Sequence, residues 1–106
     1  MQRINFDTLQ VARPRKWKGT WWIVLADIPT KQFRIAADMF QKKLKQIGFY
    51  PLQRTVWVHP FDPREEIEIV AAHYRVNPFI TSMEVKYLDP SDEEILLSFF
   101  EKGKYI

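Results

Sequence analysis

The strongest constraint on the fold is a run of eight residues, Thr20–Asp27, that is apolar on two sides. Most of its side chains are aromatic or β-branched, which favours a strand. Side chains alternate along a strand, so one face would carry Trp22, Val24 and Ala26 and the other Trp21, Ile23 and Leu25. Because a strand with two apolar faces needs cover on both, we expect it at the centre of a sheet.

Asp27 closes this run with a carboxylate, and Ile28-Pro29 then ends the strand. Two interpretations of Asp27 stay open at this point. An acid between a central strand and the following helix occupies a usual position for a metal or polar ligand. Alternatively, Asp27 helps to cap the helix, for which Thr30 is a second candidate cap.

Composition limits the class of protein. A chain of 106 residues with 46% hydrophobic and 15% aromatic residues forms one domain with a core rather than a disordered linker. It has no cysteine, which excludes disulfides, thiolate metal sites and a cysteine nucleophile and fits the cytoplasm. No run is apolar for long enough to span a bilayer, so we expect no membrane partner.

The remaining elements follow from periodicity and capping signals. The pattern predicts helices over 31–47, from Pro63 to about Tyr74 with Asp62 as the cap, and from Ser91, also a cap, to about Phe100. It predicts extended chain over 51–59, with a kink at Gln53-Arg54 that would divide it into two strands, and a strand over 79–88.

This order predicts an α+β, ferredoxin-like (split βαβ) fold: an antiparallel sheet with the first two helices on one face, plus a C-terminal helix. Residues 1–19 would be a basic N-terminal segment and 20–106 a single domain. The second face of the sheet would expose Ile23, Leu25 and Trp57, and an apolar patch of that size is typical of an interface. We therefore expect a homodimer formed through these three residues.

Charge gives a second candidate site. The net charge is +3, and Arg13–Gly19 reads RPRKWKG, which is either a solvated charge run or an arm that contacts phosphate. In the second case the candidate nucleic-acid contacts are Arg13, Arg15, Lys16, Lys18, Arg34, Lys42 and Lys45. The histidines, His59 and His73, lie in different elements and are expected to be structural.

Two stretches carry a family resemblance. WKGTWWIVLADIP and FYPLQRTVWVHP, with Arg34 between them and the Gly48-Phe49 helix exit, resemble the CRISPR-associated Cas2 family. They resemble even more closely the Cas2-like domain of the phenylacetate-repressor (PaaX) family. The resemblance covers roughly residues 13–88. Ala26, where Cas2 proteins often have an aromatic residue, and Pro29 favour the repressor family.

The resemblance implies a ferredoxin-like homodimer with Asp27 as the position of the Cas2 metal ligand, binding Mg²⁺ or Mn²⁺. It implies a scaffold that binds duplex DNA and takes part in spacer acquisition with the Cas1 integrase. It also implies metal-dependent endoribonuclease or deoxyribonuclease activity. Because no other acid in the matching strands obviously supplies a further ligand or a base, we expect that activity to be weak or absent. The alternative that it implies is a dimerisation module derived from a PaaX-type repressor and lacking the winged helix-turn-helix.

Overall fold

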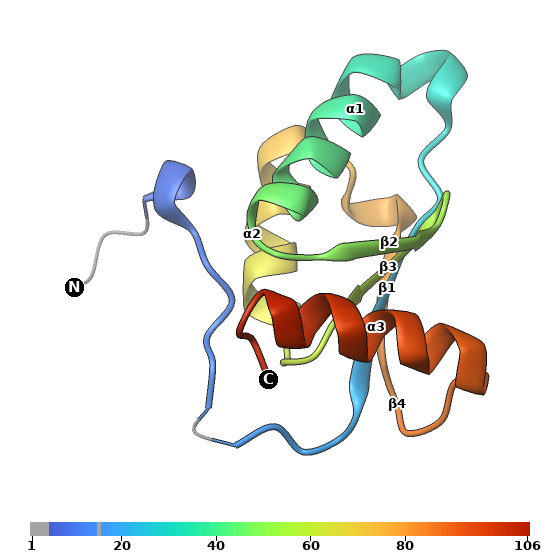
Figure 1. The fold of residues 1–106 in the computed structure, drawn as a ribbon. Coiled ribbons are helices and arrows are strands. Elements are labelled where there is room, and N and C mark those ends of the chain that lie inside the picture. Colours follow the sequence, from blue (N-terminus) through green and yellow to red (C-terminus); the bar gives the residue numbers. More distant parts are fainter. Residues whose placement is uncertain (1–4, 15) are drawn as a thin grey trace.

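The computed structural model describes residues 5–14 and 16–106. A short 3-10 turn, η1 (Phe6–Thr8), precedes the central strand β1 (Trp21–Ala26) and the long helix α1 (Thr30–Gln46). Two short strands follow, β2 (Tyr50–Gln53) and β3 (Val56–His59), and then helix α2 (Arg64–Tyr74). The chain continues through a 3-10 turn, η2 (Asn77–Phe79), and strand β4 (Ile80–Val85), and it ends with helix α3 (Pro90–Lys102). The predicted order of elements is confirmed (Figure 1).

The four strands form one antiparallel sheet in the order β2-β3-β1-β4, with β1 inside as predicted. This arrangement confirms an α+β, ferredoxin-like fold. The kink at Gln53-Arg54 is confirmed too, because a turn at Arg54-Thr55 separates β2 from β3. Within the described residues, no helix is both long and apolar enough to cross a membrane.

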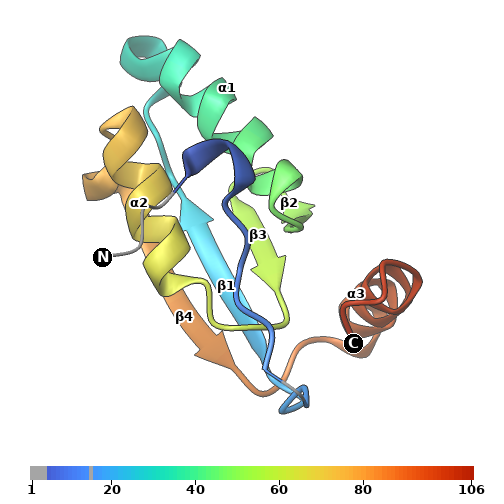
Figure 2. The ribbon, with the colours of Figure 1, turned by 90° about the vertical axis from the view of Figure 1, so that its left-hand side faces the viewer.

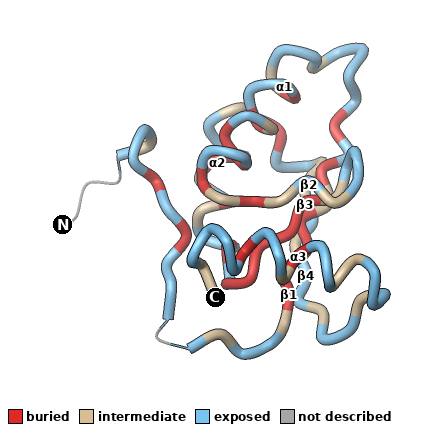
Figure 3. Tube along the Cα trace, viewed as in Figure 1, coloured by how far each residue is buried: buried red, intermediate tan, exposed pale blue. Residues whose placement is uncertain are grey.

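Helices α1 and α2 cover one face of the sheet, which we call the first face, and α3 lies across the other, the second face (Figure 2). The predicted alternation along β1 is confirmed. Val24 and Ala26 are buried in the first-face core, whereas Trp21 and Ile23 are buried in the second-face core. Buried residues accordingly follow the strands and the sheet-facing sides of the helices (Figure 3).

The grouping of Ile23, Leu25 and Trp57 on one face is wrong. Trp57 lies opposite Val24 in the β1–β3 register, and residues directly opposite in a sheet share a face. Trp57 is therefore buried in the first-face core, while Ile23 and Leu25 belong to the second face. The expectation that Ile23 is left in water is also wrong, because Leu96 and Phe100 of α3 pack in the same buried cluster.

The N-terminal segment runs along the first face and contributes to its core (Figure 2). Leu9 and Val11 are buried there, and the Phe6 ring stacks on His73 with 4.0 Å between centroids. Lys43, a buried cation on α1, donates to the backbone carbonyl of Phe6. An ammonium buried in this way is stabilised by its hydrogen bonds, so Lys43 anchors the segment to α1.

The starts of the last two helices differ from the sequence predictions by one residue each. Helix α2 begins at Arg64 with Pro63 in the cap position, one residue later than predicted, although Asp62 Oδ1 still accepts a hydrogen bond from the backbone N–H of Arg64 at 3.1 Å. The prediction of Ser91 as the cap of the last helix is wrong. That helix begins one residue earlier, at Pro90, whose fixed φ and missing N–H suit the first position.

Candidate functional site

Asp27 directly follows β1, and its side chain is exposed. Its backbone N–H donates to the carbonyl of Phe79 at 3.1 Å, which continues the ladder between β1 and β4 by one residue. No side-chain hydrogen bond caps the start of α1 in the described structure, so the capping interpretation of Asp27 finds no contact there. The carboxylate therefore stands just beyond the end of β1, an internal strand of the sheet, and is exposed.

A divalent metal needs several oxygen or nitrogen ligands in addition to one carboxylate. Among residues 5–14 and 16–106, no three Asp, Glu or His side chains lie close enough together to hold a metal ion. Glu84 does not join Asp27, because it lies opposite Trp22, near the other end of β1. The ligand set of one chain therefore does not fit the Mg²⁺ that the Cas2 resemblance implies.

The predicted nucleic-acid contacts fall into two groups. Arg13, Lys16 and Lys18 lie in the N-terminal segment, and Arg34, Lys42 and Lys45 are exposed on α1. Arg15 lies outside the described residues. The segment approaches β1 at the end of the sheet opposite the start of α1, where Arg34 lies (Figure 1). Arg34 and the cations of the N-terminal segment therefore lie towards opposite ends of the sheet.

Two of these cations have protein partners. The Arg13 guanidinium donates to the carbonyl of Lys104 at 3.1 Å and lies 4.1 Å from the centroid of the Tyr105 ring. This contact ties the N-terminal segment to the chain's C-terminal end. Lys18 Nζ lies 3.7 Å from Glu84 Oε2 on β4. Both contacts are exposed, so each contributes little to stability.

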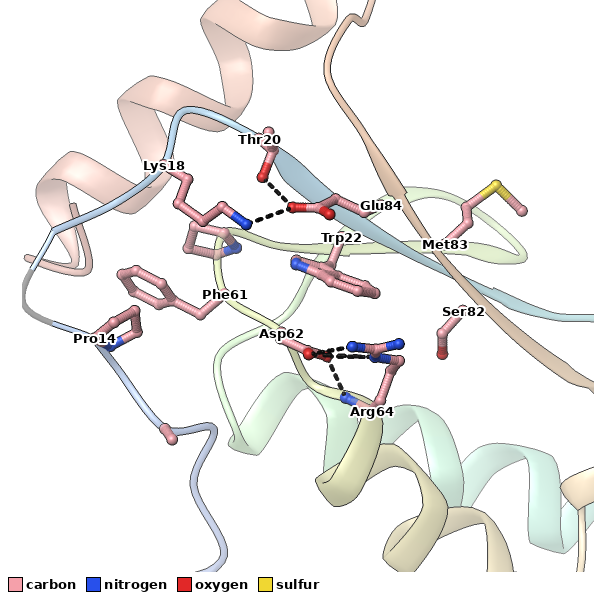
Figure 4. Close-up of a pocket in the computed structure, with 12 residues that line it drawn as sticks. Pro14, Lys18, Thr20, Trp22, Phe61, Asp62, Arg64, Ser82, Met83 and Glu84 are labelled. Atoms are coloured by element: carbon pink, nitrogen blue, oxygen red, sulfur yellow. Dashed lines mark hydrogen bonds and ion pairs between the residues drawn. The ribbon is translucent and has the colours of Figure 1, made fainter.

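A cavity of about 620 Å³ lies where the N-terminal segment, β1, β4 and the start of α2 meet (Figure 4). Trp22 lies on one side of it, with the Arg64 guanidinium 4.8 Å from its ring centroid. Asp62 binds that guanidinium through both oxygens, at 2.8 Å to Nη2 and 3.0 Å to Nε. Across the cavity, Thr20 donates to Glu84 at 2.7 Å.

The electrostatics of this cavity follow from its ion pairs. The hydrogen bond from Arg64 holds the pKa of the Asp62 carboxyl below its usual value. The sequence predicts Asp62 only as a helix cap and does not indicate a pairing of Arg64 with Trp22. The available signal was an acid two residues before an arginine, but the pairing of Trp22 with Arg64 depends on tertiary packing.

His59 is the other polar residue whose environment the sequence did not reveal. It is fully buried, its Nδ1 accepts the N–H of Phe61 at 3.1 Å, and its Nε2 has no hydrogen-bond partner. Burial lowers the pKa of His59 from 6.5 to about 4. The rings of Phe49 and Phe100 flank the imidazole, so His59 is a neutral structural group where the two cores meet.

A family model described as the PaaX protein central Cas2-like domain matches residues 14–97. The matched range starts in the N-terminal segment, includes all four strands and ends within α3. Comparison with curated proteins gave no match. The match confirms the resemblance to the PaaX Cas2-like domain that the sequence indicated.

Proposed function

The chain belongs to the PaaX family of central Cas2-like domains, and from this we propose that it is a dimerisation module of a PaaX-type transcriptional repressor. Two copies pair and hold the DNA-contacting parts of the repressor at a fixed distance. The observation that carries this proposal is the family match, which covers the whole sheet. The isolation of Asp27 supports an architectural role over a catalytic one.

The second copy packs against α3 and the adjoining part of the second face. Ile95 and Phe99 lie one turn apart on α3 and are 45% and 41% exposed. Phe99 leans against Tyr50 of β2, with 4.9 Å between ring centroids, so the exposed surface continues from the helix onto the sheet. Leu25 is partly buried at the second-face cluster, which extends the apolar surface to β1. Exposed aromatic and aliphatic side chains of this kind are typical anchors of an interface.

Sedimentation velocity at micromolar concentration tests the proposal. The wild-type chain is expected at twice the chain mass, and Ile95→Glu/Phe99→Glu is expected as a monomer because the change buries two carboxylates at the contact. The matched control is Ile35→Glu on α1, where the native side chain is 81% exposed. This control should remain a dimer. A monomeric wild type, or a dimeric double variant, would contradict the proposal.

Spacer acquisition with the Cas1 integrase is the alternative role for the same fold. A pull-down separates the two roles, because a scaffold for acquisition binds the integrase directly. Under the repressor proposal we expect no capture of a Cas1 integrase by the tagged wild-type protein. Specific capture that survives moderate salt would favour the alternative.

A further inference from the structure

Strand β4 is an edge of the sheet, and one side of its backbone faces away from β1. The N–H of Ala26 bonds to Thr55 on the β3 side, whereas the N–H of Asp27 bonds to Phe79 on the β4 side. Backbone groups alternate in direction along an antiparallel strand, so the register fixes which β4 residues bond to β1. Those whose backbone N–H and C=O point outward are Ile80, Ser82 and Glu84.

The side chains of the same three residues line hollows between β4 and α2. Ser82 and Glu84 border the cavity of about 620 Å³, and Ile80 and Ser82 border a second hollow of about 210 Å³. Both hollows also touch Arg64, so they continue one another along the strand. We call this feature the β4 groove, and it is defined by Trp22, Asp62, Arg64, Ile80, Ser82 and Glu84. Figure 4 shows Ser82 and Arg64 facing each other across it.

The surroundings of the groove are acidic. A third hollow, of about 460 Å³, shares Asp62 and Arg64 with the first and is bordered by further carboxylates of α2. Together the carboxylates along the three hollows are Asp62, Glu65, Glu66, Glu68 and Glu84. Arg64 is already bound to Asp62, so it neutralises only part of this charge. Burial, and less strongly the neighbouring Glu65 and Asp62, raise the pKa of Glu66.

The groove already accepts one cation from the chain itself. Lys18 reaches over from the N-terminal segment to within 3.7 Å of Glu84 Oε2. Its side chain is 75% exposed, and its partner Glu84 is one of the three outward residues of β4. An ammonium is thus compatible with this wall of the groove, whereas a phosphate backbone would meet its carboxylates. The charge favours a basic ligand over nucleic acid.

We propose that the β4 groove binds an extended, basic peptide segment of a partner protein by adding it as a fifth strand to the sheet. The backbone of the segment pairs with the outward groups of Ile80, Ser82 and Glu84. Its alternate side chains are lysine or arginine and point towards the carboxylates of α2. Those between them point to the other side of the sheet, where Met83 is 38% exposed.

Isothermal titration with the full chain and a capped peptide of alternating lysine and valine tests the proposal. We expect binding that weakens as salt rises, since the contact is partly electrostatic. In the first control peptide, alternate backbone nitrogens are N-methylated, so one edge of the extended peptide has no N–H donors. In the second control peptide, glutamate replaces lysine, so the charge is reversed. Neither control peptide should bind. Equal binding of the N-methylated peptide would overturn strand addition.

Variants of the protein locate the binding site. Ser82→Pro removes an outward N–H of β4 and leaves the hydrogen bonds between β4 and β1 in place. It should lower the affinity for the lysine peptide about tenfold or more. Glu65→Lys/Glu68→Lys reverses two exposed charges beside the groove and should have a similar effect. Asp38→Lys/Glu101→Lys makes the same charge change away from it, so affinity should stay within about twofold.

The outcomes are distinguishable from failure of the proposed dimerisation. If Ser82→Pro does not fold, as judged by circular dichroism, the charge variants and the N-methylated peptide still decide. If both charge-reversal pairs lower the affinity for the lysine peptide equally, the binding depends only on the net charge of the protein, and the proposal is overturned. Loss of the dimer in a folded Ser82→Pro variant would also overturn it, because a second copy of the chain would then occupy the edge.

Discussion

The two faces of the sheet are covered by helices that are tied to it in different ways. Helices α1 and α2 each run from one strand to the next, so both of their ends are fixed. Helix α3 follows β4 and is fixed to a strand only at its start. Among the described residues, the first-face core has 16 buried members and the second-face core has five. This difference indicates that the first face stabilises the whole domain, whereas the cover of the second face can detach locally.

The largest expected effect comes from truncating equivalent side chains on the two faces. Phe40 of α1 and Phe100 of α3 are both 0% exposed, so burial alone predicts equal costs. We expect Phe40→Ala to lower the free energy of unfolding by about 3–5 kcal/mol, because it leaves a cavity in the larger core. We expect a smaller global loss from Phe100→Ala, since α3 can release while the sheet stays folded. Denaturant unfolding measures both.

Hydrogen exchange sharpens this comparison. In Phe100→Ala, the amides of α3 should exchange faster while those of β1 and β3 keep their protection. In Phe40→Ala, protection should fall throughout the domain. If the two variants lose equal global stability and show the same exchange pattern, the faces form one cooperative unit and the distinction drawn between them is wrong.

The next effect arises where the two cores meet, at His59. Its pKa is lowered by burial from 6.5 to about 4, so the folded state holds the ring neutral while the unfolded state takes up a proton below pH 6.5. The free energy of unfolding should therefore fall as pH falls from 6.5 to 4, by up to about 3 kcal/mol, and the contribution of His59 should then level off. Measuring unfolding at several pH values tests this.

His59→Gln provides the matched test, because glutamine keeps a polar acceptor but does not titrate. The variant should lose most of the pH dependence between 6.5 and 4. His73→Gln, which changes an exposed histidine on α2, should keep the wild-type dependence. An unchanged pH profile in His59→Gln would show that this ring is not the source.

The first face was largely predictable from sequence, because its signals are local. The stripe of Phe40, Leu44 and Ile47 along α1 and the alternation of β1 each lie within one element. The second face was less predictable, because the burial of its residues depends on how α3 packs across the sheet. The prediction of the face that Trp57 occupies was wrong for a related reason. The face that Trp57 occupies depends on the register between β1 and β3, which places it opposite Val24, and a single strand's sequence does not contain that register.

The candidate sites show the same division. The position of Asp27 after β1 could be predicted, because a strand end is a local property. The groove around Trp22, Arg64 and Ser82 could not, since it joins three elements that are far apart in sequence. Likewise, the sequence placed Arg13 in a solvated charge run or a phosphate-contacting arm, whereas the structure bonds it to the carbonyl of Lys104.

A smaller effect is expected on the outer surface of the first face, where α1 carries Lys42 and Lys45. Both side chains are exposed, in contrast to the buried Lys43 between them. If they contact phosphate, Lys42→Glu/Lys45→Glu should weaken binding to duplex DNA of any sequence and flatten its salt dependence by roughly two units of slope. Fluorescence anisotropy at several salt concentrations measures this. The matched control is Lys31→Glu/Lys102→Glu, which makes the same charge change at two other exposed lysines. If this control weakens DNA binding equally, the effect comes from net charge alone and not from a contact at Lys42 and Lys45.

The smallest effect is expected at Asp27, which lies beyond the end of β1 and is exposed. Asp27→Asn keeps the size of the side chain and the backbone bond to Phe79, so the free energy of unfolding should change by less than about 0.5 kcal/mol. Dimer mass should not change unless two copies bring their carboxylates together, in which case removing like charges would tighten the dimer. Because no further ligands converge on Asp27 within the described chain, we expect at most weak Mg²⁺- or Mn²⁺-dependent cleavage from the wild type. A nuclease assay with both proteins decides the question: robust cleavage by the wild type that disappears in Asp27→Asn would show that two copies assemble a metal site, and the module would then be an enzyme.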